Sequence, residues 1–139
     1  MTDFNDRIIA EFRANDGVVG GPFTGAQLLL LTTTGAKSGE RRVAPVMYFA
    51  EGDTSYVIAS KAGSPTNPAW FHNLVAHPTV SVEAATDDGI ESYTATAEQV
   101  TGELRERLYT KFSSTNPGFA EYQRKTDRVI PIVALTRAG

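Results

Sequence analysis

Two short loops hold the residues of this chain that are best suited to bind an anion. They consist of Lys37, Ser38, Gly39, Arg41 and Arg42 in the first loop, and of Ser60, Lys61, Gly63 and Ser64 in the second. Each loop comes at the end of an apolar, strand-like run. Backbone N–H groups in Gly/Ser turns attract anions, and nearby cationic side chains add charge-assisted hydrogen bonds. The two loops therefore predict a binding site for an anionic small molecule.

The chain as a whole is acidic, which makes this local positive charge informative. The formal net charge is -3 at pH 7, and the isoelectric point is about 5.3. A domain that binds nucleic acid is normally strongly basic, so we expect no nucleic-acid partner. Two plainer interpretations stay open: Lys37, Arg41 and Arg42 can form a solvated surface cluster, and Lys61 can be a solubilising loop lysine.

Other site chemistries find little support in the sequence. The serines at 38, 60 and 64 lie near His72 and His77 along the chain, but the G-x-S-x-G motif of serine hydrolases is absent. The two histidines are five residues apart without a nearby carboxylate, which is poor spacing for a metal site, so no metal is predicted. Neither a P-loop nor a G-x-G-x-x-G motif occurs.

Length and composition indicate an ordinary globular chain. We expect a single domain over residues 1–139, since this length supports one hydrophobic core. The absence of cysteine excludes disulfides and thiolate chemistry and agrees with a cytoplasmic location. The first fifteen residues lack a signal-peptide pattern, and the longest apolar run, 26–31, is far too short to span a bilayer. No transmembrane segment is predicted.

Residues 1–16 predict an N-terminal amphipathic helix. Phe4, Ile8, Ile9 and Phe12 recur at helical spacing, and the 15–17 segment, Asn-Asp-Gly, is a stop signal. We expect this apolar face to pack on the body of the protein. A face of this kind can also lie on a membrane surface, which leaves a peripheral contact with the inner face of the plasma membrane open.

The remaining pattern alternates strands with short helices. Strands are expected at 27–34, 42–50, 55–60, 79–84, 91–99 and 129–135, and helices at 68–76, at 102–112 and after 116. Six mostly antiparallel strands with inserted helices favour a small α+β barrel over a doubly wound sheet. Asn67 and Thr101 are expected to cap two of the helices, Trp70 to be a core residue, and Leu104 to stack with Leu108 on the third helical segment.

Four strings occur in order along the chain: TTTGAKSGERRVAPVMYF, VIASKAGSPTNPAWFHNL, HPTVSVE and EYQRKTDRVIPIVAL. Together they resemble the deazaflavin-dependent nitroreductase family of actinobacteria, over about residues 26–135. The resemblance implies a split β-barrel, related to the barrels that bind flavin mononucleotide. It also implies coenzyme F420, an 8-hydroxy-5-deazaflavin, as cofactor. Reduced F420 would give a hydride to a quinone, a nitroaromatic compound or another small electron-poor acceptor.

The resemblance also assigns roles to individual positions. Cofactor contacts are implied at Ala36, Lys37 and Ser38, at Arg42, Val43, Ala44, Pro45, Val46 and Met47, at Ile58, Ala59, Ser60 and Lys61, and at Ala69, Trp70, Phe71, His72 and Asn73. Tyr122 matches a tyrosine on the substrate side of the family pocket, whereas Phe119 stands where the best-known members have tyrosine. The hydroxyls of Ser60 and Tyr122 are expected to act in catalysis, by hydrogen bonding to the acceptor oxygen as negative charge builds there.

Several alternatives remain at this stage. The chain can be a split barrel that uses flavin mononucleotide, or a carrier that binds the deazaflavin without turning it over. His72 can be a structural residue, and Tyr122 can be a packing aromatic with a solvated hydroxyl. The sequence fixes neither the physiological acceptor nor the oligomeric state.

Overall fold

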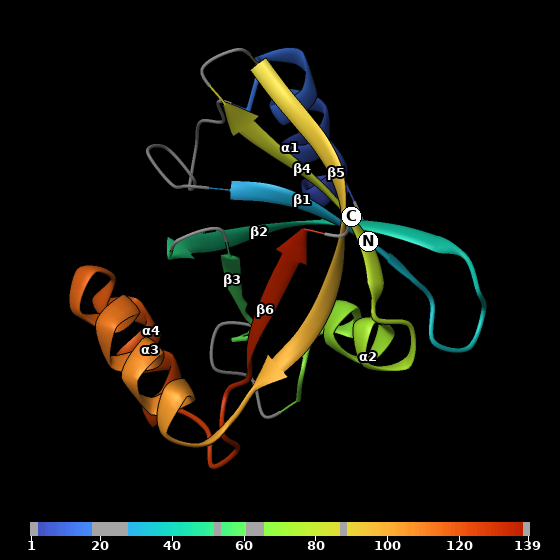
Figure 1. Ribbon diagram of the computed structural model, residues 1–139. Helices are drawn as coiled ribbons and strands as arrows, with labels where there is room; N and C mark the ends of the chain where they lie inside the picture. Colours follow the sequence, from blue (N-terminus) through green and yellow to red (C-terminus); the bar gives the residue numbers. More distant parts are fainter. Residues whose placement is uncertain (1–2, 18–27, 52–53, 61–65, 87–88, 138–139) are drawn as a thin grey trace.

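The computed structural model describes residues 3–17, 28–51, 54–60, 66–86 and 89–137. Within this part of the chain, six strands close into a barrel in the order β1-β2-β3-β6-β5-β4, and every neighbouring pair is antiparallel. Figure 1 shows the barrel with helices around it. The strands are β1 (Leu28–Thr34), β2 (Arg41–Glu51), β3 (Thr54–Ile58), β4 (Thr79–Thr86), β5 (Gly89–Val100) and β6 (Ile132–Arg137). The predicted α+β split-barrel fold is confirmed.

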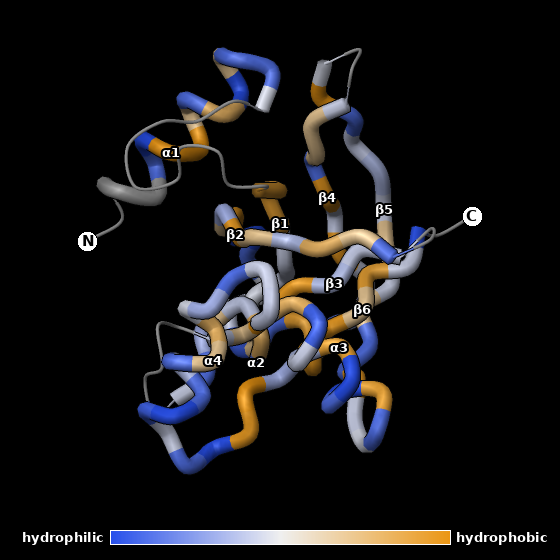
Figure 2. Tube along the Cα trace, turned by 90° about the vertical axis from the view of Figure 1, so that its left-hand side faces the viewer, coloured by the Kyte–Doolittle hydropathy of each residue, from blue (hydrophilic) through white to orange (hydrophobic). Residues whose placement is uncertain are grey.

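Side chains fill the inside of the barrel. The buried core comprises Leu29, Leu31, Val57, Ala59, Phe71, Leu74, Val80, Val82, Ala84, Ala95, Ala97, Val133 and Leu135. Most of these residues alternate along their strands, because successive side chains in a strand point to opposite faces. β1 is an exception, since Leu28 and Leu30 on its outer face are buried as well. Figure 2 shows the resulting apolar character of β1.

Helix α1 (Asp3–Ala14) covers the outer face of β1. Its residues Ile8 and Phe12 are buried against Leu28 and Leu30. On the polar side, the Arg13 guanidinium donates to both carboxylate oxygens of Glu83, at 3.0 and 2.7 Å. The described residues of the apolar face considered for a membrane contact, Ile8, Ile9 and Phe12, therefore pack against the barrel. None of the helices in the described ranges is long and apolar enough to cross a membrane.

Helix α2 (Ala69–Ala76) lies against one end of the barrel and sends Phe71 and Leu74 into its core. The predicted cap at Asn67 is wrong, because the helix begins one residue later with Pro68 as its N-cap and no side-chain cap bond. The Asn67 side chain instead accepts a hydrogen bond from Arg128, at 2.6 Å.

Helices α3 (Gly102–Thr115) and α4 (Pro117–Arg124) lie side by side over the outer faces of β2, β3 and β6. The rings of Phe49 on β2 and Phe112 on α3 are stacked with their centroids 4.3 Å apart. Leu104 does not join this contact and is 44% exposed, so the predicted stack with Leu108 is wrong. The inward turn of α3 instead carries Arg105, which is buried with its guanidinium donating to Ile130 O.

Two strand and cap details also differ from expectation. Thr101 is the N-cap residue of α3, but its side chain makes no cap hydrogen bond. The last strand begins at Ile132 rather than 129, and Val129 is exposed. Pro131 lacks an N–H group and cannot donate to a sheet ladder, which explains the late start. Its carbonyl still accepts from Ala59 N, at 2.9 Å.

Candidate active site

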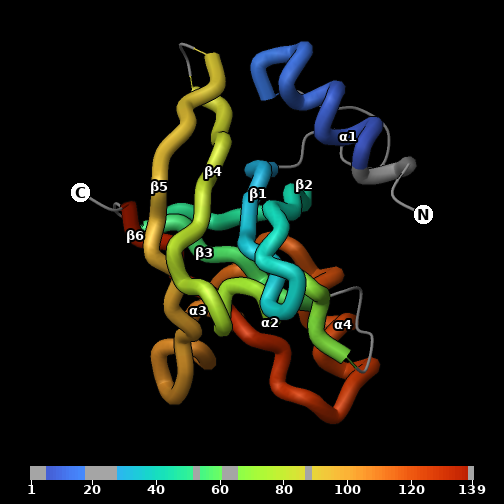
Figure 3. Tube along the Cα trace, turned by 90° about the vertical axis from the view of Figure 1, so that its right-hand side faces the viewer, coloured from blue at the N-terminus to red at the C-terminus, as the bar shows by residue number. Residues whose placement is uncertain are grey.

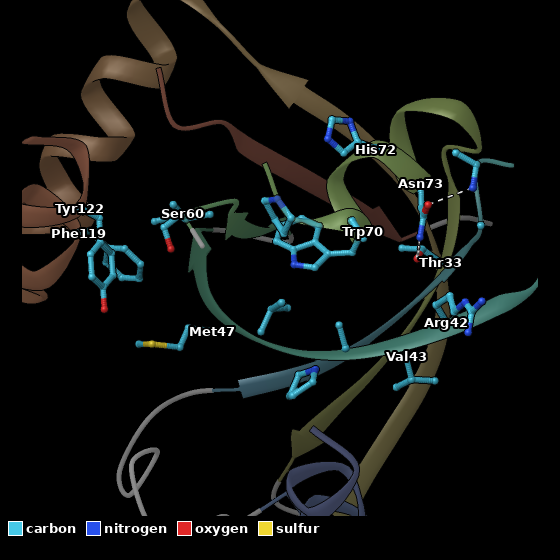
Figure 4. A pocket seen from close by; sticks show the side chains of 18 of the residues that line it. Thr33, Arg42, Val43, Met47, Ser60, Trp70, His72, Asn73, Phe119 and Tyr122 are labelled. Carbon is cyan, nitrogen blue, oxygen red and sulfur yellow. Dashed lines mark hydrogen bonds between the residues drawn. The ribbon is translucent and has the colours of Figure 1, made fainter. Parts of the chain in front are cut away.

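A cavity of about 1490 Å³ runs along β2 between α2 and α4. Figure 4 shows Trp70 near its middle, Arg42, Thr33 and Asn73 toward one end, and Phe119 and Tyr122 toward the other. The lining comes from the end of β1, the β1–β2 loop, β2, the end of β3, α2, the end of α3 and α4. Segments far apart in the sequence therefore build one site.

Most of the residues that the resemblance marked for the cofactor line this cavity. They are Ala36, Lys37, Ser38, Arg42, Val43, Ala44, Pro45, Val46, Met47, Ile58, Ser60, Ala69, Trp70, His72 and Asn73, and Tyr122 lines it as well. Ala59 and Phe71 are instead buried in the barrel core. Lys61 lies outside the described residues. Trp70, expected in the core, is only partly buried, and it packs against the core while facing the cavity.

Other lining residues were not selected from the sequence. Thr33, Gly35, Pro68, Thr115, Asn116, Pro117 and Gly118 also border the cavity. A signal existed for two of them within the TTTGAKSG string, because Gly35 directly precedes Ala36 and Thr33 stands two residues before Gly35. The Asn-Pro pair at 116–117 was interpreted only as a helix start, although the same turn brings α4 to the cavity.

The end of the cavity at the β1–β2 loop is cationic. Lys37 and Arg42 line the cavity there, and no carboxylate lines it within the described residues. Arg42 pairs with Glu40 at 2.8 Å, but both side chains are more than half exposed, at 63% and 65%. Such surface pairs contribute little free energy, so Arg42 can exchange this partner for a ligand at small cost. Arg41 does not line the cavity, and its guanidinium donates instead to Ser81 on β4, at 2.8 Å.

The loop that carries Lys37 has a defined turn geometry. Gly35 N–H donates to Glu40 O at 2.7 Å, Gly39 N–H donates to Gly35 O at 3.0 Å, and Glu40 N–H donates to Ser38 Oγ at 3.1 Å. A Cβ atom on Gly35 would lie 2.4 Å from Ser38 Oγ, so a side chain there would displace the serine. The turn therefore holds Lys37 and Ser38 at the cavity before any ligand binds.

Asn73 connects this loop to the barrel. Its Oδ1 accepts from Ala36 N–H at 3.0 Å, and its Nδ2 donates to Thr33 Oγ1 at 3.1 Å. Asn73 is only 8% exposed and Thr33 is buried. Figure 3 shows α2 beside the β1–β2 loop, which is the proximity that these two bonds secure. The side chain thus has a structural task in addition to lining the cavity.

The opposite end of the cavity is apolar and aromatic. Met47, Phe119 and Tyr122 lie there with Ser60, as Figure 4 shows. The rings of Phe119 and Tyr122 meet edge to face with centroids 5.9 Å apart. Tyr109 on α3 donates its hydroxyl proton to Phe119 O at 2.6 Å and so anchors α4. Burial raises the pKa of Tyr109, which keeps this hydroxyl a neutral donor.

A family model described as F420H(2)-dependent quinone reductase matches residues 6–137. The chain belongs to this family. It is 36% identical over 132 residues to an F420H(2)-dependent quinone reductase of Mycobacterium tuberculosis, with 92% of this chain and 86% of that protein covered. The resemblance to deazaflavin-dependent reductases is thereby confirmed.

Solved structures agree with the family placement. A structure named F420-H2 dependent reductase (FDR-A) matches with a TM-score of 0.69 and 41% identity, over 78% of this chain and 93% of its own. A FAD-binding protein from Mesorhizobium loti matches with a TM-score of 0.57 at 13% identity, over 96% of this chain and 88% of its own. The second match shows the shared barrel fold alone.

We predict that Asn73→Ala destabilises this reductase-family chain by about 1–3 kcal/mol, because it leaves the Ala36 N–H and the Thr33 hydroxyl without their buried partner. Urea denaturation of the two proteins measures the difference. Thr33→Val is the matched control, since it removes only the Thr33 side of the bridge and should cost less. Equal stability of Asn73→Ala and the unchanged protein would contradict the structural task assigned to Asn73.

Proposed function

We propose that this protein is an oxidoreductase that uses reduced coenzyme F420 to reduce a quinone or another small electron-poor acceptor. The observation that carries the proposal is the polarity of the cavity. Cationic residues occupy one end and aromatic residues the other, in a chain whose net charge is negative. Membership of the F420H(2)-dependent quinone reductase family supports the same assignment.

The residues present fit the chemistry of this cofactor. F420 combines a planar deazaflavin ring with a phosphodiester and an oligoglutamate tail, so it is anionic at one end and aromatic at the other. Lys37 and Arg42 are suited to phosphate and carboxylate oxygens, one as a point charge and the other as a planar fork. The cavity exceeds the roughly 300–1,000 Å³ of a typical ligand pocket, which leaves room for an acceptor beside the ring.

The chain's own contribution to the reaction is binding, orientation and exclusion of water. When bound, reduced F420 supplies the hydride, and the protein has to hold donor and acceptor at contact distance. Trp70, Met47 and Phe119 offer apolar surface for two stacked planar molecules. The hydroxyls of Ser60 and Tyr122 are available as hydrogen-bond donors where negative charge develops on the acceptor.

The first test of the proposal is selection between cofactors. We expect the purified protein to bind F420 with micromolar or tighter affinity and flavin mononucleotide much more weakly, since the latter carries one phosphate and no oligoglutamate tail. Titration calorimetry with each cofactor measures this directly. Equal or tighter binding of flavin mononucleotide would assign the site to a flavin. Binding of F420 without oxidation of its reduced form by quinones would indicate a carrier.

Removing a cavity cation should weaken F420 binding and leave the fold intact. Lys37→Ala and Arg42→Ala are each expected to lower affinity by about ten- to a hundred-fold, which corresponds to roughly 1.5–3 kcal/mol for one charge-assisted contact. Arg41→Ala is the control, because this neighbouring cation points to Ser81 and should bind F420 as the unchanged protein does. If all three variants bind F420 as tightly as the unchanged protein does, the basic cluster is solvated charge with no ligand.

The Tyr122 hydroxyl is expected to act on the acceptor rather than on the cofactor. Tyr122→Phe should lower turnover about ten-fold, or roughly 1.4 kcal/mol, with F420 affinity nearly unchanged. Steady-state kinetics with quinone and nitroaromatic acceptors, run beside thermal melting, measure both effects. A merely packing tyrosine would leave turnover unchanged for every acceptor, because phenylalanine keeps the ring.

A further inference from the structure

The guanidinium of Arg128 joins three segments behind the aromatic end of the cavity. Its Nη1 donates to Ala59 O at 3.2 Å and to Asn67 Oδ1 at 2.6 Å, and its Nη2 donates to Ser60 O at 2.8 Å. Ala59 and Ser60 follow β3, Asn67 precedes α2, and Arg128 itself lies between α4 and β6. One side chain therefore fastens the end of β3 to the beginning of α2 and to the connection that follows α4.

These contacts fix the backbone on both sides of Ser60. The carbonyl of Ala59 belongs to the peptide group before the Ser60 Cα, and the carbonyl of Ser60 belongs to the group after it. When both peptide planes are held, the two backbone dihedral angles between them are held too, and the direction of the side chain follows. The backbone N–H of Ala59 also has a partner, because it donates to Pro131 O at 2.9 Å. Arg128 thus constrains the Cα–Cβ bond of Ser60, which carries the hydroxyl.

Arg128 is itself tied to the helix that carries Tyr122. The next residue along α4, Gln123, donates from Nε2 to Arg128 O at 2.7 Å. The Oε1 of the same amide accepts from Ile130 N–H at 3.0 Å and from the buried Arg105 at 2.7 Å. The link from Ser60 through Arg128 to Gln123 therefore sets the position of Ser60 relative to α4.

Partial burial of the Arg128 guanidinium costs desolvation free energy, which its hydrogen bonds must offset. Burial lowers the pKa of Arg128 from its ordinary value, with a smaller opposing effect from Tyr109. Two of the three acceptors described are backbone carbonyls and the third is a side-chain amide oxygen, so all three are neutral. These contacts therefore satisfy N–H donors of the planar guanidinium. A planar fork with several donors can serve three acceptors at once, which a lysine ammonium cannot do in the same geometry.

We propose that Arg128 is a positioning residue. It acts through Ser60, whose hydroxyl it aligns with the acceptor during hydride transfer. Arg128 holds the backbone of the site from behind and leaves the contact with ligands to Ser60. This inference rests on the proposed function, since it concerns the rate of acceptor reduction. It adds a residue from the segment before β6 to a site otherwise built from β1, β2, β3, α2, α3 and α4.

The test compares Arg128→Gln with Arg124→Gln in acceptor reduction. Arg124 is the matched control because it lies four residues earlier and pairs only with the exposed Glu121 among the contacts described here. With menadione as the acceptor and reduced F420 at saturation, kcat should fall about ten-fold in Arg128→Gln and stay unchanged in Arg124→Gln. Arg128→Lys should recover part of the loss. F420 affinity and melting temperature are measured on the same samples.

A double-mutant cycle with Ser60→Ala separates positioning from simple stabilisation. If Arg128 acts through Ser60, the variant with both substitutions is no slower than Ser60→Ala alone, because the group being aligned is already gone. Full kcat in Arg128→Gln below its melting temperature would overturn the inference, as would additive losses or an unchanged kcat in Ser60→Ala. Should Arg128→Gln fail to fold, Arg128→Lys enters the same cycle with the same criteria. If the unchanged protein does not reduce menadione or any other quinone, the proposed function itself fails, and that result is visible without any variant.

Discussion

The closed barrel is filled by its own side chains, and this constraint determines where a ligand can bind. Small barrels of this kind have an interior just wide enough for packed residues. Here Leu29, Val57, Val82 and Leu135 are among the residues that occupy it. A cavity of about 1490 Å³ therefore lies beside the filled interior, along β2, and residues from both faces of this strand line it. The barrel acts as a rigid support for this site.

β2 is the strand on which the surrounding elements converge. Val43 and Met47 pack against the cluster that α1 covers, whereas Phe49 and again Met47 pack against the cluster beneath α3 and α4. The wall of the cavity is thus shared with two hydrophobic clusters outside the barrel. Because packed interiors resist small changes in volume, a substitution at Met47 would be felt by the cavity and by both clusters.

The sequence predicted the parts of this molecule that depend on local pattern. Strand runs, the Gly/Ser loop at Lys37 and the helix start at the Asn-Pro pair before Gly118 all depend on residues close in sequence, and each was found near its expected place. The family strings also marked Lys37 and Arg42, which line the cavity. The strand expected at 27–34 was also found, and its continuous leucine run reflects burial on both faces rather than the alternation of a half-exposed strand.

Features that depend on distant contacts escaped prediction for a physical reason. Asn67 has the residue type of a helix cap, yet Arg128, 61 residues away, takes its side chain as a partner. Leu104 has the spacing of a core residue, yet the inward position on that turn belongs to Arg105, whose guanidinium donates to the carbonyl of Ile130 in another segment. Helical periodicity indicates which residues share a face, but the choice of face depends on what packs there.

The bond between Ala36 and Asn73 has a consequence for how the protein folds. It links residues 37 positions apart, and it forms only when α2 has docked at the end of the barrel. The cationic end of the cavity should therefore mature late in folding, after the barrel has assembled. Partly folded molecules would then have no competent anion site, and the chain would acquire its ligand only as an almost complete structure.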